Sequence, residues 1–275
     1  MDGQLIALIV LALFFDFLNG IHDSSNIVAT IISSRSLSPK WALSLTAVSE
    51  FCGPFLFGVA VAKTIGSEII PPVHMTMPVL LSALGGAILW NLLTWYLGIP
   101  SSSSHALIGG LIGAAATGVG FGGIRIEGLN KVFIALFLSP VIGLAAGFVF
   151  TKLVYWLSAG ASMKINYFFK RVQVLTGIGL ALSHGANDAQ KTMGIITLGL
   201  VTTGTLSTFE VPLWVVGISA LAIALGTVSG GWRLIKTLGA GFFRVRPVHG
   251  FSAQVTAAGV ILGAAFLGGP VSTTQ

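Results

Sequence analysis

One stretch of this chain places acidic, amide and hydroxyl side chains at helical spacing inside a long apolar run. The intervals alternate between three and four residues, so a helix would carry the whole set on one face: Asp16, Asn19, Asp23, Asn26 and Thr30. Amides and hydroxyls in membrane helices commonly bond neighbouring helices, which is our interpretation of Asn19 or Thr30 taken singly. An ionisable group at membrane depth costs roughly 2.5–3.5 kcal/mol or more, so the carboxylates indicate a functional site for a cation or a proton.

A second stretch, LSHGANDAQKTMGII, repeats this chemistry in the other half of the chain. It carries three polar residues at the same helical spacing: His184, Asp188 and Lys191. The shift that superimposes Asp23 on Asp188 also superimposes Gly20 on Gly185. Lys191 either supplies a fixed positive charge for an anion or pairs with Asp188 one turn away, and the sequence favours the two equally.

Two clusters of hydroxyl side chains each follow a proline. Residues 101–104 follow Pro100, and residues 272–274 follow Pro270 by two positions. Such residues cap helix N-termini, where each hydroxyl satisfies an unpaired amide. A helix N-terminus with several hydroxyls and free amides is also a ready anion site, and the two roles are compatible. The candidate anion-binding hydroxyls are those of Ser102, Ser103, Ser104, Ser272, Thr273 and Thr274.

The composition indicates that these groups lie in a membrane protein. Of the 275 residues 54% are hydrophobic and only 8% are charged, and the mean hydropathy is +0.94. The net charge of +6 is spread over short loops, which is typical of proteins oriented in a bilayer and argues against nucleic-acid binding. The single cysteine, Cys52, excludes an intrachain disulfide, and no histidine spacing indicates a zinc site. The N-terminal apolar run lacks a basic n-region and is expected to be a retained first span.

Several apolar segments approach the roughly 20 residues that a span requires. They lie near residues 4–32, 41–63, 78–98, 104–121, 132–157, 172–200, 212–230 and 249–267. The pair 78–121 is either two full spans or one re-entrant hairpin, and both alternatives return the chain to the same face.

Basic residues concentrate in alternate connections. One side carries Arg35, Lys40, Lys164, Lys170, Arg171, Arg233, Lys236, Arg244 and Arg246, and the other carries Lys63, Arg125 and Lys131. Because cytoplasmic loops carry the excess of lysine and arginine, the first side is expected to be cytoplasmic and the N-terminus outside. We therefore predict a multi-pass protein of the plasma membrane.

The same order of polar motif and hydroxyl cluster in both halves predicts an internal repeat. We assign residues 1–121 to the first repeat, 122–171 to a connecting span and basic loop, and 172–275 to a second repeat that is incomplete at its C-terminus. The first copy starts outside and the second starts inside, so the copies are inverted. The predicted fold is an all-α integral membrane protein of two inverted-topology repeats with broken helices or re-entrant hairpins, which is typical of secondary transporters.

The paired motifs resemble those of the inorganic phosphate transporter (PiT) family. GIHDSSN and GANDAQK are similar to that family's paired G-x-N-D signatures, and PSSSSH and PVSTTQ to its paired Pro-Ser/Thr tips. The chain departs from the family pattern where Ile21 and His22 replace the usual Ala-Asn, where Lys191 replaces a small or amide residue, and where the sequence stops after the second tip. It therefore looks like a C-terminally shortened member.

The resemblance implies a secondary active transporter of inorganic phosphate by Na⁺ or H⁺ symport, without enzymatic activity and with no cofactor beyond the co-transported cation. Asp23 and Asp188 would bind that cation, and they would be the metal ligands if it is Na⁺. The hydroxyl clusters, with Asn26, Asn187 and Lys191, would bind phosphate. Carboxylates tolerate a phosphate when a cation lies between them or when the carboxylate accepts the phosphate proton, and either arrangement couples the two substrates.

Other functions stay open as alternatives. A transporter of sulfate or another oxyanion would use the same machinery, but sulfate carries no proton at neutral pH. An intramembrane serine hydrolase would use a serine of residues 101–104 with His105, which predicts one asymmetric site and not a duplicated one. An inactive or assembly-only fragment is a third alternative. The expected partners are inorganic phosphate and the lipid bilayer, with a homodimer as an open question of assembly.

Overall fold

The computed structural model describes residues 3–162, 164–232, 235 and 246–274, and every regular element within them is helical. The α-helices are α1 (Gly3–Ser33), α2 (Pro39–Phe57), α3 (Ala60–Lys63), α4 (Met77–Leu97), α5 (Ser103–Gly118), α6 (Ile126–Leu157), α7 (Ile165–Thr202), α8 (Leu213–Ser229) and α10 (Pro247–Phe266). Short helices of other types are η1 (Thr64–Glu68), η2 (Pro72–His74) and η3 (Phe121–Gly123). The predicted all-α class is confirmed.

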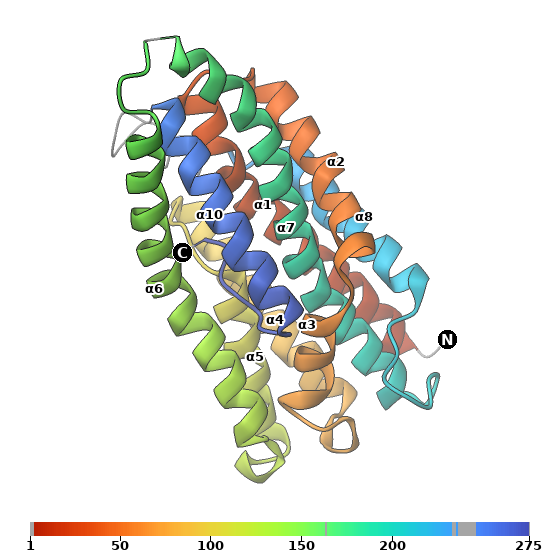
Figure 1. Cartoon of the computed structure of the whole chain (residues 1–275). Coiled ribbons are helices and arrows are strands. Elements are labelled where there is room, and N and C mark those ends of the chain that lie inside the picture. The colour runs from red at the N-terminus through yellow and green to blue at the C-terminus, as the bar shows by residue number, and fades with distance from the viewer. Residues whose placement is uncertain (1–2, 163, 233–234, 236–245, 275) are drawn as a thin grey trace.

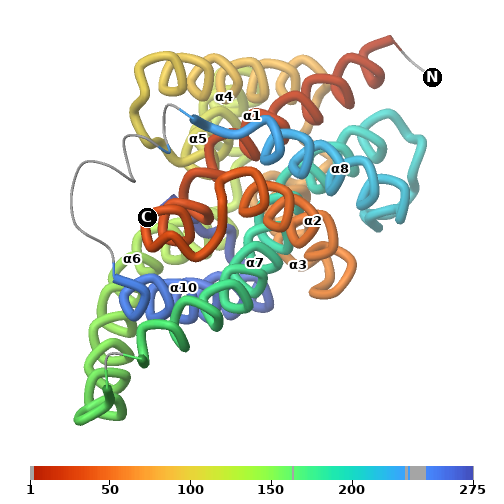
Figure 2. Tube along the Cα trace, turned by 90° about the horizontal axis from the view of Figure 1, so that it is seen from above, coloured from red at the N-terminus to blue at the C-terminus, as the bar shows by residue number. Residues whose placement is uncertain are grey.

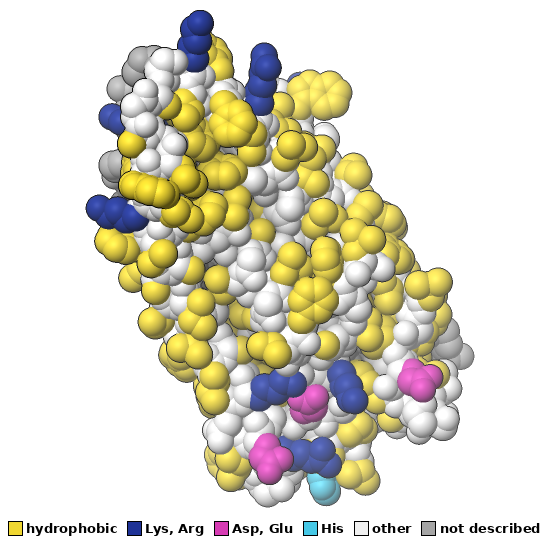
Figure 3. All heavy atoms as spheres, in the orientation of Figure 1, with side chains coloured by type: hydrophobic (Ala, Val, Ile, Leu, Met, Phe, Trp, Pro, Cys, Tyr) yellow, Lys and Arg dark blue, Asp and Glu magenta, His cyan; other side chains and the backbone are white. Residues whose placement is uncertain are grey.

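Long apolar helices run side by side through the molecule (Figure 1). Among the described helices, α1, α4, α6 and α10 are each long and apolar enough to cross a membrane, and α2 joins them if it is counted with its bent continuation. Only 11% of the most apolar part of α6 is buried. The visible surface between the two ends of the molecule is largely hydrophobic (Figure 3). Such a surface fits the hydrocarbon region of a bilayer.

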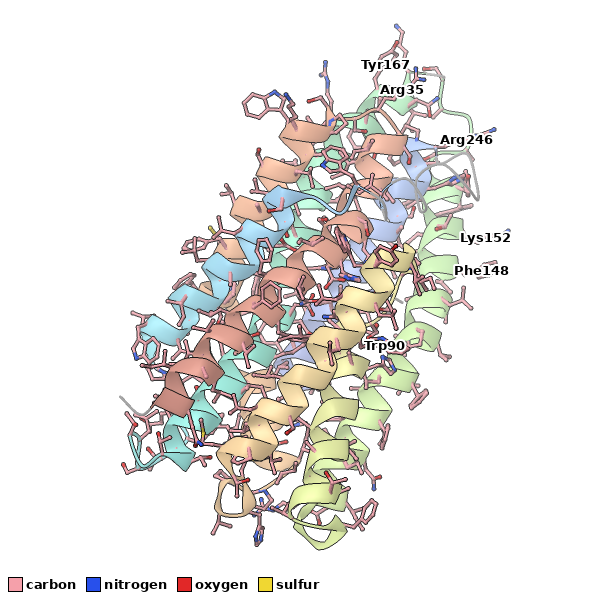
Figure 4. The ribbon with its side chains drawn as sticks, turned by 180° about the vertical axis from the view of Figure 1, so that it is seen from behind. Arg35, Trp90, Phe148, Lys152, Tyr167 and Arg246 are labelled. Carbon is pink, nitrogen blue, oxygen red and sulfur yellow. The ribbon has the colours of Figure 1, made fainter. Side chains whose placement is uncertain are left out.

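The two ends of the molecule differ in charge (Figure 3). One end, which we call the basic end, is formed by the end of α1, the connection from α6 to α7 and the start of α10, and Figure 4 shows Arg35 and Arg246 there. The connections of the opposite end, which we call the mixed end, carry both signs: Lys63, Arg125 and Lys131 with Glu68, Glu127 and Glu210. The basic residues assigned to the two sides lie at the predicted ends where the structure describes them, while Arg233, Lys236 and Arg244 lie outside the described residues.

The helices that carry the two polar motifs run in opposite directions. α1 rises from the N-terminus at the mixed end to the basic end, and α7 starts at the basic end and descends beside it (Figure 1). α8 packs against α1, whereas α2 packs against α7, so each repeat supports the motif helix of the other. This arrangement has the inverted relation that the sequence predicts.

Glycines allow the closest of these helix crossings. A Cβ on Gly20 of α1 would lie 2.2 Å from the carbonyl oxygen of Ile223 on α8. Similarly, a Cβ on Gly185 of α7 would lie 2.0 Å from the carbonyl oxygen of Glu50 on α2. Small residues at such crossings let helix backbones approach in membranes. The two glycines that superimpose in the sequence therefore have the same role in the two repeats, since each allows a close backbone crossing.

α4 and α5 form a hairpin that enters from the mixed end and turns halfway along the bundle (Figure 1). Gly98 ends α4 in the left-handed region, with φ of 69°. Gly110 of α5 lies against α4, where a Cβ would come within 2.5 Å of the Ala83 carbonyl oxygen. The structure thus favours the re-entrant hairpin over two full spans for residues 78–121.

The predicted span near residues 41–63 is broken into two helical segments. α2 ends at Phe57, and the segment from α3 through η1 continues at an angle of 74° after Gly58, which has φ of 79°. The break frees backbone amides at the start of α3. The side-chain oxygen of Gln190 on α7 accepts hydrogen bonds from Val61 N at 2.8 Å and Ala62 N at 3.2 Å. A buried side chain therefore satisfies the amides that a membrane would leave unpaired.

Candidate functional site

The two motif aspartates lie buried and close to one short segment at the C-terminal end of the described chain. This segment, which we call the second tip, comprises residues 268–274. The Thr274 hydroxyl donates to Asp23 Oδ1 at 3.4 Å, and the Thr273 hydroxyl donates to Asp188 Oδ2 at 3.2 Å. Two neighbouring residues thus connect the carboxylates of α1 and α7.

The turn between α4 and α5, which we call the first tip and which comprises residues 98–104, contacts the second tip directly. The Ser104 hydroxyl donates to the Val271 carbonyl oxygen at 2.7 Å, and the Thr274 hydroxyl lies 3.2 Å from the Ser101 carbonyl oxygen. Both tips lie about halfway between the ends of the bundle (Figure 1). Figure 1 and Figure 2 both show the second tip ending beside α6. The sequence-predicted hydroxyl clusters are therefore brought together.

Asparagines hold the second tip against both motif helices. Asn26 Nδ2 donates to Asp23 Oδ1 at 3.0 Å and lies 3.4 Å from the Thr274 hydroxyl oxygen. Asn187 Nδ2 donates to the Gly269 carbonyl oxygen at 3.3 Å, while its own side-chain oxygen accepts no hydrogen bond. Both predicted amides thus belong to the cluster.

Lys191 brings a fully buried ammonium group to the second motif. Its Nζ donates to Asp188 Oδ1, and His184 Nδ1 lies 3.7 Å from Asp188 Oδ2. The pairing of Lys191 with Asp188 that the spacing suggested is therefore present. Because the ammonium also lies within the polar cluster, it provides a positive charge where an anion would enter.

The remaining predicted hydroxyls have different surroundings. Ser102 caps α5, since its Oγ accepts from His105 N at 3.2 Å and lies 2.8 Å from His105 Nδ1. Ser103 is buried in the first turn, where backbone amides have no partner inside the helix. Ser272 Oγ is buried without a hydrogen-bond partner, and this residue lines a cavity of about 650 Å³ between α6 and α10. Ser272 thus borders the cluster and does not join its hydrogen bonds.

Sequence reasoning gave too little weight to three buried groups. Asp16 and Asn19 are fully buried on α1, and none of their side-chain nitrogen or oxygen atoms makes a hydrogen bond. Glu50 of α2 accepts a hydrogen bond from Thr227 of α8, and it is buried whereas the neighbouring Cys52 is exposed. The regular spacing of α1 already pointed to Asp16 and Asn19. Nothing in the sequence indicates that Glu50 meets α8.

The cluster can bind an oxyanion and a small cation together. Ammonium, amide and hydroxyl donors and the N-terminus of α5 favour an anion with several oxygens. Carboxylate and amide oxygens favour a hard monovalent cation or a proton. Among the described residues no group of three or more histidine, cysteine or acidic side chains could hold a metal ion.

Two tips that meet halfway through an inverted bundle, beside paired carboxylates, are the arrangement of a secondary membrane transporter. The chain belongs to the phosphate transporter family, whose sequence model matches residues 19–275.

Similar proteins agree with this assignment. The chain is 45% identical to a Bacillus subtilis protein named "Probable low-affinity inorganic phosphate transporter", over 98% of this chain and 82% of that protein. A Rhizobium meliloti protein of the same name is 46% identical with the same coverage. The solved structure titled "The sodium-dependent phosphate transporter" has a TM-score of 0.90 at 24% identity, covering 99% of this chain and 87% of that one, which supports the same fold.

The family assignment confirms the predicted resemblance and excludes the hydrolase alternative, because the relatives are transporters and not enzymes. The contact between Ser102 and His105 is accordingly a helix cap. It holds the first tip and has no nucleophilic role.

Proposed function

We propose that this chain transports inorganic phosphate across the plasma membrane in symport with a cation, and that both bind where the two tips meet. The observation that carries this proposal is the convergence of the tips on both motif aspartates, through Thr274 on Asp23 and Thr273 on Asp188. The names of the relatives support phosphate as the substrate.

Phosphate would bind to groups that now bond one another. The Lys191 ammonium, the Asn26 amide and the hydroxyls of Thr273 and Thr274 supply donors from α1, α7 and the second tip. The first turn of α5 adds free amides and the serine hydroxyls, with Ser104 already in contact with the second tip. Ser272 and Asn187 would complete the set as the tips rearrange.

The cation is needed because the same site contains carboxylates that would repel phosphate. Asp188 is already paired with Lys191, whereas Asp23 accepts only neutral donors and its Oδ2 accepts none. A Na⁺ ion or a proton on Asp23 removes its negative charge and makes room for the anion. Asp188 would also bind the cation once the Lys191 ammonium leaves it and binds phosphate. Substrate and cation therefore bind together or not at all.

The opposed directions of α1 and α7 suggest how the site is exposed to the two sides in turn. Inverted repeats can exchange conformations, so that one end opens as the other closes around a fixed midplane site. We assign the basic end to the cytoplasm and the N-terminus to the outside, because lysine and arginine concentrate in cytoplasmic loops.

Uptake of labelled phosphate into proteoliposomes, with Na⁺ and pH gradients varied separately, tests the proposal. We expect one of the two gradients to drive phosphate accumulation and sulfate to compete poorly. Accumulation without dependence on either cation would contradict symport, and equal transport of sulfate would favour the alternative oxyanion.

Calorimetry on the purified protein gives an independent test of the shared site. Phosphate should strengthen binding of the coupling cation, and the cation should strengthen binding of phosphate by the same factor, because linkage is reciprocal. Independent affinities would mean that the two substrates do not share the site.

A further inference from the structure

Asp16 is a buried carboxyl group that the proposed phosphate site does not use. It lies on α1 two turns before Asp23, on the face directed to α7, and its side chain is fully buried. Neither carboxylate oxygen accepts a hydrogen bond. An ionised carboxylate in such surroundings is costly, because burial removes its water and no donor at standard hydrogen-bond geometry replaces it. The group therefore requires a bound cation or a proton.

The neighbouring polar groups are also unpaired. Asn19, one turn further along α1, has neither its amide nitrogen nor its oxygen in a hydrogen bond, and it is fully buried. Thr192 of α7 lies beside Asp16 as a hydrogen-bond donor to it, although its buried hydroxyl is outside standard hydrogen-bond geometry. Three adjacent polar side chains from two helices thus form a small buried site. We call it the Asp16 site.

The charges around the Asp16 site are acidic in balance. Asp23 faces Asp16 from its own helix, and Asp188 and Lys191 face it from α7. Lys191 already bonds Asp188, so Asp16 has no counter-ion of its own. Among the other helices packed on α1, α2 adds the buried acidic Glu50 and carries Lys40 at its start, at the basic end. α4 and α8 carry no acidic, basic or histidine residue, and α10 carries only His249, at its start.

The Asp16 site is separate from the tips. The hydrogen bonds of the second tip reach Asp23 and Asp188, and none of them reaches Asp16. A ligand on Asp16 can therefore be present with or without phosphate between the tips. It would act on the phosphate site through charge, because neutralising Asp16 reduces the repulsion on both motif aspartates.

We propose that Asp16 carries a proton that is co-transported with phosphate, with Asn19 and Thr192 as its hydrogen-bond partners. This inference rests on the cation symport proposed above and adds a second loading position to it. A proton suits the site because a neutral carboxyl group needs only one oxygen acceptor, which the Asn19 carbonyl or the Thr192 hydroxyl provides. A metal cation would need several oxygen ligands close to the Lys191 ammonium, which repels it.

The proton is taken up from water on one side of the membrane and released to water on the other. Asp16 would hold it while the carboxylates lie near phosphate and lose it when the site opens to the cytoplasm. The number of protons moved with each phosphate is then one higher than Asp23 and Asp188 alone would give.

Infrared spectroscopy of the full chain in lipid nanodiscs, without phosphate, tests protonation directly. We expect the carbonyl stretching band of a protonated carboxyl group, and we expect Asp16→Asn to remove it. Thr192→Val should shift that band, because it removes a hydrogen-bond partner of Asp16. This second variant tests the protonation of Asp16 if Asp16→Asn does not fold. Thr197→Val is the matched control, since Thr197 is also a buried, unbonded threonine of α7. A band unchanged in both Asp16→Asn and Thr192→Val would overturn the proposal.

Phosphate accumulation in proteoliposomes tests the coupling. Each co-transported proton adds about a tenfold accumulation of phosphate per unit of pH gradient, so Asp16→Asn should lower the gradient response by one such factor. Thr197→Val should keep the wild-type response. An unchanged response in Asp16→Asn, or a loss that follows Na⁺ and not pH, would overturn the proposal. If the wild-type chain moves no phosphate, the proposed function fails, whereas the infrared band still decides whether Asp16 holds a proton.

Discussion

The two motif aspartates occupy matched positions in the two repeats but have different partners. Asp23 on α1 accepts hydrogen bonds from Asn26 and Thr274, both neutral. Asp188 on α7 accepts from Thr273 and also from the Lys191 ammonium. The residue one turn after each aspartate makes the difference, since Asn26 and Lys191 superimpose in the repeat.

This difference separates what the repeat duplicates from what it does not. The backbone crossings are duplicated, because Gly20 and Gly185 both meet a helix of the opposite repeat at backbone distance. The charge is not duplicated, because the position held by Lys191 in the second motif is held by the neutral Asn26 in the first. We infer that the repeats share a common framework for motion, while the first half binds the exchangeable cation and the second half holds a fixed one.

Removing either carboxylate should have the largest effect on transport. Asp23→Asn and Asp188→Asn each keep the side-chain volume but remove the charge that holds a cation or accepts the phosphate proton. We expect both variants to lose coupled phosphate uptake in proteoliposomes. Glu210→Gln removes an exposed carboxylate at the mixed end and should keep uptake. Normal uptake by both aspartate variants would show that the motif aspartates only hold helices together.

The same two variants should differ in stability, which tests the contrast between the halves. Asp23→Asn leaves no charge unpaired and should fold as the wild type does, or slightly better. Asp188→Asn leaves the buried Lys191 ammonium without its partner, a loss of about 3–5 kcal/mol. The double variant Asp188→Asn with Lys191→Asn should recover most of it. Thermal unfolding in detergent measures the stability of the two single variants and the double variant. Equal stability of the single variants would contradict the proposed difference between Asp23 and Asp188.

A good part of this arrangement is predictable from the sequence. The carboxylates and hydroxyl clusters can be recognised because polar groups in apolar runs are rare. The distribution of basic residues among the loops predicts the orientation in the membrane. The break after Phe57 escapes such reasoning, because Gln190 supplies the partners for the freed amides from more than a hundred residues away. Likewise, only the folded chain reveals that Asp16 has no hydrogen bond while Asp23 has two.

Adding a methyl group at the two matched glycines should disturb both halves alike. In Gly20→Ala and Gly185→Ala the new Cβ would fall 2.2 Å and 2.0 Å from a carbonyl oxygen of the crossing helix. The backbones must move apart, which costs about 1–3 kcal/mol in a packed interior. Gly217→Ala on α8 is the control, since a Cβ there meets nothing within 4 Å. We expect lower unfolding temperatures for Gly20→Ala and Gly185→Ala than for this control. A large difference between these two variants would mean that the two crossings are not equivalent.

The smallest effects should come from the two threonines that connect the second tip to the carboxylates. Thr274 hydrogen-bonds Asp23, Asn26 and the Ser101 carbonyl, whereas Thr273 hydrogen-bonds Asp188 and lies close to Asp23. Valine keeps the branched shape of threonine and removes the hydroxyl, and the bonds lost are long, between 3.2 and 3.4 Å. We expect each substitution to cost about 1 kcal/mol or less of phosphate binding free energy per bond, so that Thr274→Val weakens binding more than Thr273→Val does. Calorimetric titration with phosphate compares the two affinities directly. A stronger effect of Thr273→Val would mean that the half with the fixed lysine, and not the half with the exchangeable cation, positions the tip.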